Sequence, residues 1–114
     1  MEGSELGSVD TEWERIKGEA SAAYAALVAA QRAHCASLDR VGIVRASFGP
    51  AAYSISHLHG RDYSEAARML GAEVDARLAP LLVEVERLGK LRGQAREALA
   101  VARAAWVAAG MGRE

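Results

Sequence analysis

The sequence predicts an all-α protein. We expect an irregular four-helix bundle, with two long helices at about 11–40 and 80–109 and a short helical hairpin at about 50–78. Alanine is abundant, while two prolines and one phenylalanine leave few helix breakers or strand formers, so intrinsic propensity favours helix almost throughout. In both long segments, apolar residues recur at alternating steps of three and four, the spacing of packed helices. Glycine and proline separate the segments near residues 49–50 and 60.

The length of 114 residues is that of one domain, which we place at 9–110 between flexible tails at 1–8 and 111–114. The formal net charge of -1 gives no general attraction for nucleic acid. The chain has a single cysteine, an acidic start unlike a signal peptide, and no apolar run long enough to cross a membrane. We therefore expect a soluble intracellular protein, cytoplasmic by default.

The first long helix is expected to begin at Thr11, which can form a capping box with Glu14. Its end lies somewhere from 39 to 47, because Gly42 interrupts the pattern. A seam at heptad spacing runs along this helix, and we expect it to be buried. Its members are Trp13, Ile16, Ala20, Ala23, Leu27, Ala30, His34, Ser37, Val41 and Val44.

The hairpin at about 50–78 is predicted from local signals. Pro50 suits the first turn of a helix, Gly60 can adopt the left-handed conformation that ends it, and Asp62 with Glu65 offers a capping box for the next helix. We expect helices from about 50 to 59 and from about 63 onward. The inner face of this hairpin should complete the core, and its outer face should be polar.

The stretch "GRDYSEAARML" holds Gly60, Tyr63, Ala66 and Ala67 at a spacing that resembles the Gly-x-x-Tyr and following alanine of a tetratricopeptide repeat. Pro80 stands roughly where such a repeat ends. The resemblance is confined to about residues 50–80, and it implies a helical hairpin that binds another protein. The chain departs from the family pattern in two ways: its first hairpin helix is short, and no second copy follows at a spacing of about 34 residues.

The fourth helix carries the most regular seam of the chain, in which Arg92 is the one charged member. We place its start near Pro80, because proline disfavours helical geometry at the residue before it. A kinked continuation from the third helix stays open, because Ala67, Gly71 and Val74 keep the same register. The seam consists of Leu78, Leu81, Val85, Leu88, Arg92, Ala95, Leu99, Ala102, Trp106 and Ala109.

A second face of this helix is rich in small residues, which would let another backbone approach closely. A helix with two packable sides favours contact with a partner. We therefore take this face as the candidate interface, formed by Leu82, Gly89, Gly93, Arg96, Ala100, Ala104 and Val107. Within the seam, we expect Arg92 either to extend to solvent or to meet Glu12, Glu14 or Glu19 of the first helix.

No constellation in the sequence predicts catalysis, a cofactor or a metal. His57 and His59 are two residues apart and so point to different sides of a helix. His34 and Cys35 are direct neighbours and do not face each other. We thus expect no catalytic, cofactor-binding or metal-ligating residue and no enzyme activity.

The leading hypothesis is a protein–protein interaction module, an assembly, adaptor or scaffold subunit whose partner is another protein or a second copy of the chain. An alternative is a helical regulator that binds a small ligand or peptide between the hairpin and the first helix, near Tyr24, Tyr53 and Tyr63. A third class, an enzyme, has no candidate catalytic residue.

Overall fold

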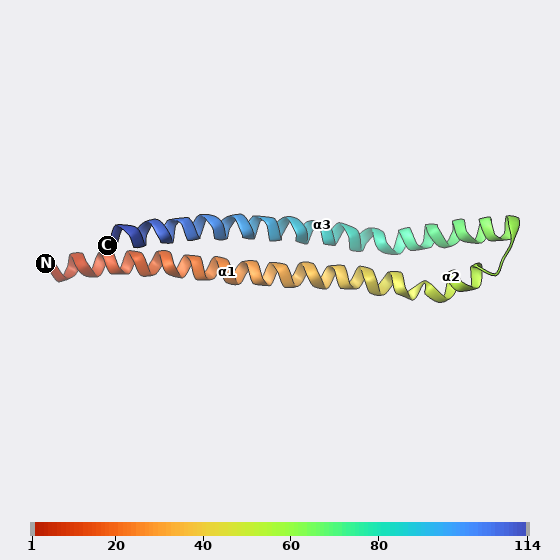
Figure 1. Ribbon diagram of the computed structural model, residues 1–114, viewed down its shortest axis with the longest axis horizontal. Coiled ribbons are helices and arrows are strands. Elements are labelled where there is room, and N and C mark those ends of the chain that lie inside the picture. The colour runs from red at the N-terminus through yellow and green to blue at the C-terminus, as the bar shows by residue number, and fades with distance from the viewer. Residues whose placement is uncertain (1, 114) are drawn as a thin grey trace. The chain divides into compact units, whose positions relative to one another are not determined.

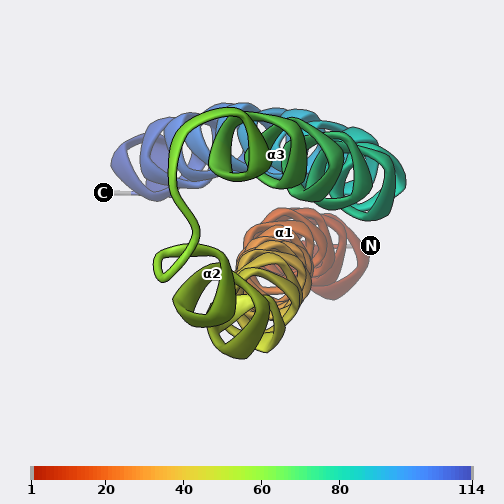
Figure 2. The ribbon, with the colours of Figure 1, turned by 90° about the vertical axis from the view of Figure 1, so that its right-hand side faces the viewer.

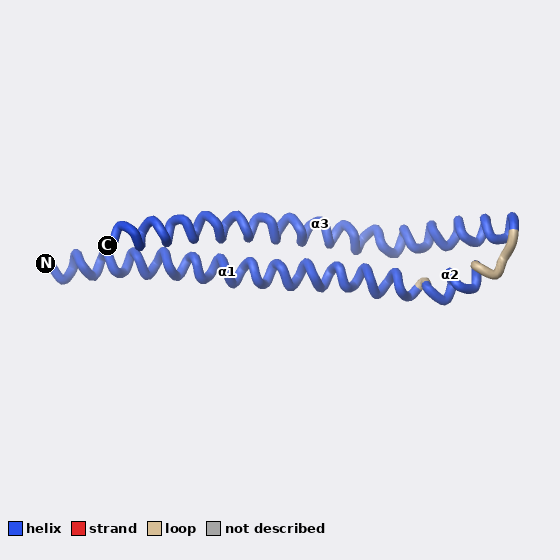
Figure 3. Tube along the Cα trace, viewed as in Figure 1, coloured by secondary structure: helices blue, strands red, loops and turns tan. Residues whose placement is uncertain are grey.

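The computed structural model describes the backbone of residues 2–113 and the side chains of residues 11–110. This part of the chain contains three helices and no strand: α1 (Glu2–Ser47), α2 (Gly49–Ile55) and α3 (Gly60–Arg113) (Figure 3). The tails predicted at 1–8 and 111–114 lie outside the residues whose side chains are described. The all-α class is confirmed for the described residues.

The chain divides into two compact units, which are described separately. The terminal unit comprises Met1–Arg32 and Lys90–Glu114, and the turn unit comprises Ala33–Gly89. Both long helices, α1 and α3, contribute to each unit.

The predicted four-helix bundle is wrong, because the expected third and fourth helices are one helix. Pro80 lies inside α3 instead of starting a helix, and Thr11 lies inside α1 instead of capping its start. A proline within a helix costs about 3 kcal/mol. The Pro80 ring is exposed, while Leu78 is buried and Leu81 half-buried beside it. The seam therefore continues past the proline in one register, and its packing offsets the cost.

In the terminal unit, α1 and α3 lie side by side and antiparallel (Figure 1). The indole Nε1 of Trp13 lies 3.7 Å from the position that a Cβ at Gly110 would occupy. Ala20 and Leu99 are each 5% exposed and form the buried centre of this unit. The other predicted seam residues of the unit, Leu27 among them, are half-buried and not buried as expected. The heptad spacing therefore predicted the packed stripe but not its degree of burial.

In the turn unit, residues 33–47 of α1 pack against α3. The buried side chains are those of Ser37, Val41, Leu78 and Leu88. Ser37 satisfies its hydroxyl by donating a hydrogen bond to the carbonyl oxygen of His34, at 2.6 Å. The remaining predicted seam residues of this unit are half-buried, so the heptad spacing identified the packed stripes here as well.

The short helix α2 and the turn after it reverse the chain within the turn unit. Figure 2 looks onto this turn. Pro50 occupies the first turn of α2, as predicted, but α2 ends at Ile55 and not near 59. Gly60 is the first residue of α3 and has a φ of 58°, a left-handed conformation that glycine adopts without strain. The predicted hairpin of two short helices is thus one short helix followed by the start of a long one.

Candidate functional site

The residues of the candidate interface all lie on α3, but they do not share one environment. Leu82 and Val107 are large and exposed, at 45% and 57%. Gly93, Arg96, Ala100 and Ala104 are also exposed. Gly89 differs, because a Cβ there would lie 3.4 Å from Nε2 of His34. Gly89 therefore faces α1 inside the turn unit and is not part of an outward surface.

A hollow of about 330 Å³ lies in the turn unit between α2 and the first turns of α3. We call it the Tyr63 hollow. Asp75 is the one charged residue among those that line it. The others are mainly apolar, and the set comprises Ala52, Ile55, Ser56, Tyr63, Ala67, Leu70, Gly71, Val74 and Asp75.

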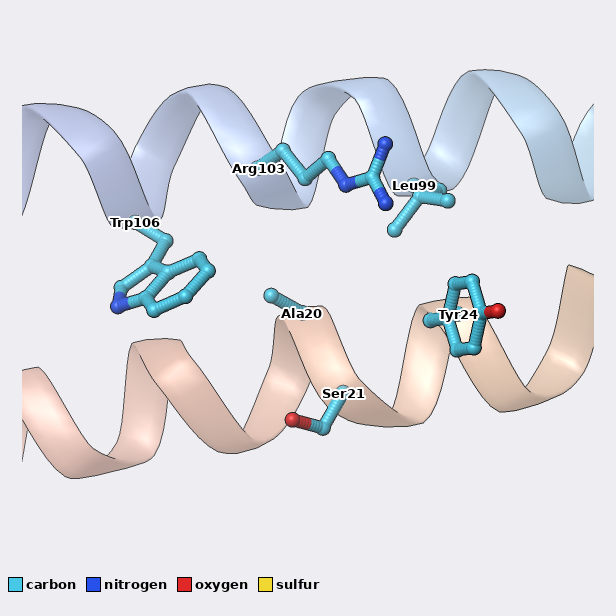
Figure 4. A pocket seen from close by; sticks show the side chains of 6 residues that line it. All are labelled: Ala20, Ser21, Tyr24, Leu99, Arg103 and Trp106. Atoms are coloured by element: carbon cyan, nitrogen blue, oxygen red, sulfur yellow. The ribbon is translucent and has the colours of Figure 1, made fainter.

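A second hollow, of about 340 Å³, lies in the terminal unit between α1 and α3. We call it the Trp106 hollow. Figure 4 shows Trp106 and Tyr24 at its opposite ends, with Ala20 extending from α1 and Leu99 from α3 into the space between the two helices. The guanidinium of Arg103 lies along α3 on the side of Leu99. The last lining residue is Ser21, whose hydroxyl points away from α3.

The tyrosines named for a ligand pocket lie in different places. Tyr24 lines the Trp106 hollow and Tyr63 lines the Tyr63 hollow. Tyr53 is 69% exposed, and its ring meets that of His57 edge-on at 4.8 Å between centroids.

Each of three ion pairs joins two residues of the same helix, three or four positions apart. Arg15 pairs with Glu12 and Glu19 on α1, and Arg87 pairs with Glu84 on α3. The hydrogen bond from Arg15 lowers the pKa of Glu12. The hydrogen bond from Arg87 likewise lowers the pKa of Glu84, with a smaller contribution from the charge of Arg40. These pairs are exposed and therefore contribute little to stability.

The expected pairing of Arg92 with a carboxylate near the start of α1 does not fit the register. Within the terminal unit, Trp13 lies opposite Gly110. Arg92 lies 18 residues before Gly110, so in antiparallel helices it is level with Gln31, 18 residues after Trp13. At 1.5 Å per residue, the half-buried Arg92 is therefore about 27 Å from the level of Trp13 along α1. Glu12 and Glu19 instead bond Arg15.

The described side chains include one free cysteine and no metal-binding cluster. Cys35 is exposed. No group of three or more His, Cys, Asp or Glu side chains within the described residues could hold a metal ion. Across the same residues, no helix combines the length and apolar character that a membrane span requires.

The Trp106 hollow was not predicted from the sequence. A partial signal was present, because the seam of α1 places the small residue Ala20 where α3 supplies the large residues Leu99 and Trp106. The cross-helix register was needed to bring Tyr24 and Arg103 to the same place. In the comparisons with known proteins, no family model, no curated protein and no solved structure matches this chain.

Proposed function

We propose that this chain is a non-enzymatic protein–protein interaction module, an assembly, adaptor or scaffold subunit that binds another protein or a second copy of itself. The observation that carries the proposal is an imbalance between buried and exposed apolar side chains. Among the side chains of residues 11–110, five hydrophobic ones are buried and twelve large ones are exposed.

This imbalance has a physical origin in the pairing of helices. A helix packed against one neighbour covers one stripe, and apolar residues outside that stripe stay in water. Scattered exposed apolar side chains are ordinary, but adjacent ones mark interaction surfaces. In the turn unit, α3 exposes the consecutive residues Leu82 and Val83 by 45% and 67%. In the terminal unit, α3 exposes Val101 and Val107 by 71% and 57%.

The outward residues of the candidate interface are the favoured contacts. In the turn unit, Leu82 supplies apolar area. In the terminal unit, Val107 supplies apolar area, and the small residues Gly93, Ala100 and Ala104 would let a partner helix approach. Gly89 is left out, because it faces His34.

The test is the combined replacement of Leu82→Glu and Val107→Glu, which puts a charge at the exposed apolar contact residue of each unit. If the chain binds itself, light scattering after size exclusion should give the wild-type chain a mass above that of one copy. If it binds another protein, affinity capture from the host should retain that partner. The double variant should lose that association with unchanged helix content, because both side chains are exposed.

The matched control carries the same two charges at the exposed alanines Ala25 and Ala76, and it should associate as the wild type does. A wild-type chain that is monomeric at every concentration and retains no protein would contradict the proposal. Equal loss of association in the control would show that added charge, and not this surface, is responsible.

A further inference from the structure

The Trp106 hollow has an apolar floor between two aromatic walls. Its floor is formed by Ala20 and Leu99, each 5% exposed. Trp106 is half-buried and Tyr24 is 54% exposed, and they stand at the two ends (Figure 4). The volume of about 340 Å³ falls in the range of sites for small molecules, about 300–1,000 Å³. A flat apolar group can therefore lie over the floor and against the ring faces.

The same hollow holds a cation that forms no ion pair with a carboxylate of residues 11–110. Arg15 and Arg87 have carboxylates three or four residues away on their own helices. Arg103 has Leu99, Ala100, Trp106 and Val107 at those positions, and within residues 11–110 no ion pair joins it to a carboxylate. Its guanidinium thus offers its hydrogen-bond donors to a ligand at the rim of the hollow.

On α1, the nearest base is Lys17, one turn before Ala20 and Ser21. The Lys17 ammonium lies 5.2 Å from the centre of the Trp13 ring. Lys17 is therefore engaged outside the hollow, which leaves Arg103 as the charge among the lining residues.

We propose that the Trp106 hollow binds a planar aromatic monocarboxylate. The ring lies on Ala20 and Leu99 between Trp106 and Tyr24, and the carboxylate accepts hydrogen bonds from the guanidinium of Arg103. One guanidinium matches one carboxylate in charge and in its two-pronged geometry. A doubly charged phosphate would carry a second, unmatched charge next to the apolar floor. A cation held by the aromatic rings would be repelled by Arg103.

The proposal is tested with cinnamate, a planar aromatic monocarboxylate, and with cinnamamide, its uncharged counterpart. Nuclear magnetic resonance of the nitrogen-labelled chain at fixed ionic strength reports on both. We expect cinnamate to bind with a dissociation constant on the order of 1 mM, as suits a ligand of this size. It should shift the indole signal of Trp106 and the amide signals of Ala20 and Leu99. Cinnamamide should bind more weakly.

Two arginine variants separate a specific contact from general attraction. Arg103→Gln should weaken cinnamate binding about two- to fivefold, the effect of losing an exposed ion pair, and should leave cinnamamide unaffected. Arg32→Gln is the matched control, because Arg32 is exposed on α1 in the same unit and does not line the hollow. It should bind cinnamate as the wild type does. Both variants should melt as the wild type does, because both arginines are exposed.

Several results would overturn this inference: no cinnamate shift at millimolar concentration, shifts that map away from the hollow, or equal weakening by Arg32→Gln and Arg103→Gln. Equal dissociation constants for cinnamate and cinnamamide would also overturn it. The inference does not rest on the proposed interaction function. A chain that is monomeric, retains no protein in affinity capture and yet binds cinnamate through Arg103 would contradict the interaction proposal alone.

Discussion

The Cβ position of Gly89 on α3 lies 3.4 Å from Nε2 of His34 on α1, so the two helices approach closely in the turn unit. A methyl group added here would make a close but ordinary van der Waals contact, so the imidazole would not have to move far.

We therefore expect Gly89→Ala to raise the free energy of unfolding by about 0.5–1 kcal/mol, since alanine is the better helix former. Gly93→Ala, where a Cβ meets no atom within 4 Å, should give the same gain. Gly89→Leu should instead be destabilising, because its longer side chain meets His34. Urea titrations of the three variants measure these changes, and a loss of stability in Gly89→Ala would show that His34 cannot adapt.

Leu88 is 8% exposed and belongs to the buried centre of the turn unit. Leu88→Ala should destabilise the chain by about 2–5 kcal/mol, the range for removing a core leucine. Leu91→Ala is the control on the same helix, because Leu91 is 42% exposed and its loss should change the free energy by about 0.5 kcal/mol or less. Melting curves that shift equally for the two variants would contradict the seam.

Gly93→Leu should abolish self-association or partner capture while the monomer stays folded, because the exposed glycine would carry a bulky side chain into the contact. Alanines at His57, His59 and Arg61 together should leave association intact. Light scattering and affinity capture compare the two variants. If association is lost with the three alanines and kept with Leu at position 93, the interface lies at the turn.

Arg92 is the charged, half-buried member of the α3 seam. Arg92→Leu should keep or raise the melting temperature, since a leucine in a seam avoids the cost of dehydrating a guanidinium. The variant should also associate less selectively, because the charge restricts which partner or register is accepted. A melting temperature that falls sharply with unchanged association would show that Arg92 acts structurally.

Glu12 should titrate below its ordinary pKa of 4.5, because Arg15 donates hydrogen bonds to its ionised form. With the pKa lowered by folding, the stabilisation from this pair is complete above the unfolded pKa and is lost as the pH falls through the folded one. Carboxyl carbon resonances measured against pH give the midpoint. Arg15→Gln should return Glu12 to its ordinary range and leave the lowered pKa of Glu84 in place.

The packed stripes of both long helices could be predicted from the sequence, but the number of helices could not. Every predicted seam member, from Trp13 to Val44 and from Leu78 to Ala109, is buried or half-buried, because heptad spacing determines which face of a helix can pack. Heptad spacing does not say how many helices share a core. Pro80 suggested a break, yet the register that Ala67 and Val74 share with Leu78 was the stronger signal.

The candidate surfaces depended on information that no single helix contains. The α3 pattern could not show that Gly89 faces His34, because the facing residue belongs to α1. In the same way, the register of the terminal unit was needed to place Arg103 beside Tyr24 and Trp106. Such cross-helix neighbours depend on the turn that sets the register.

The turn at Gly60 also gives the two units different folding requirements. In the turn unit, the guanidinium carbon of Arg77 lies 6.0 Å from the centre of the Phe48 ring, with 28 residues between them. Closing that loop costs less entropy than closing a longer one. In the terminal unit, the contact of Trp13 with Gly110 joins nearly opposite ends of the described chain. Pairing that starts at the turn shortens the remaining loop at every step, so α1 and α3 can close progressively from Gly60 outward.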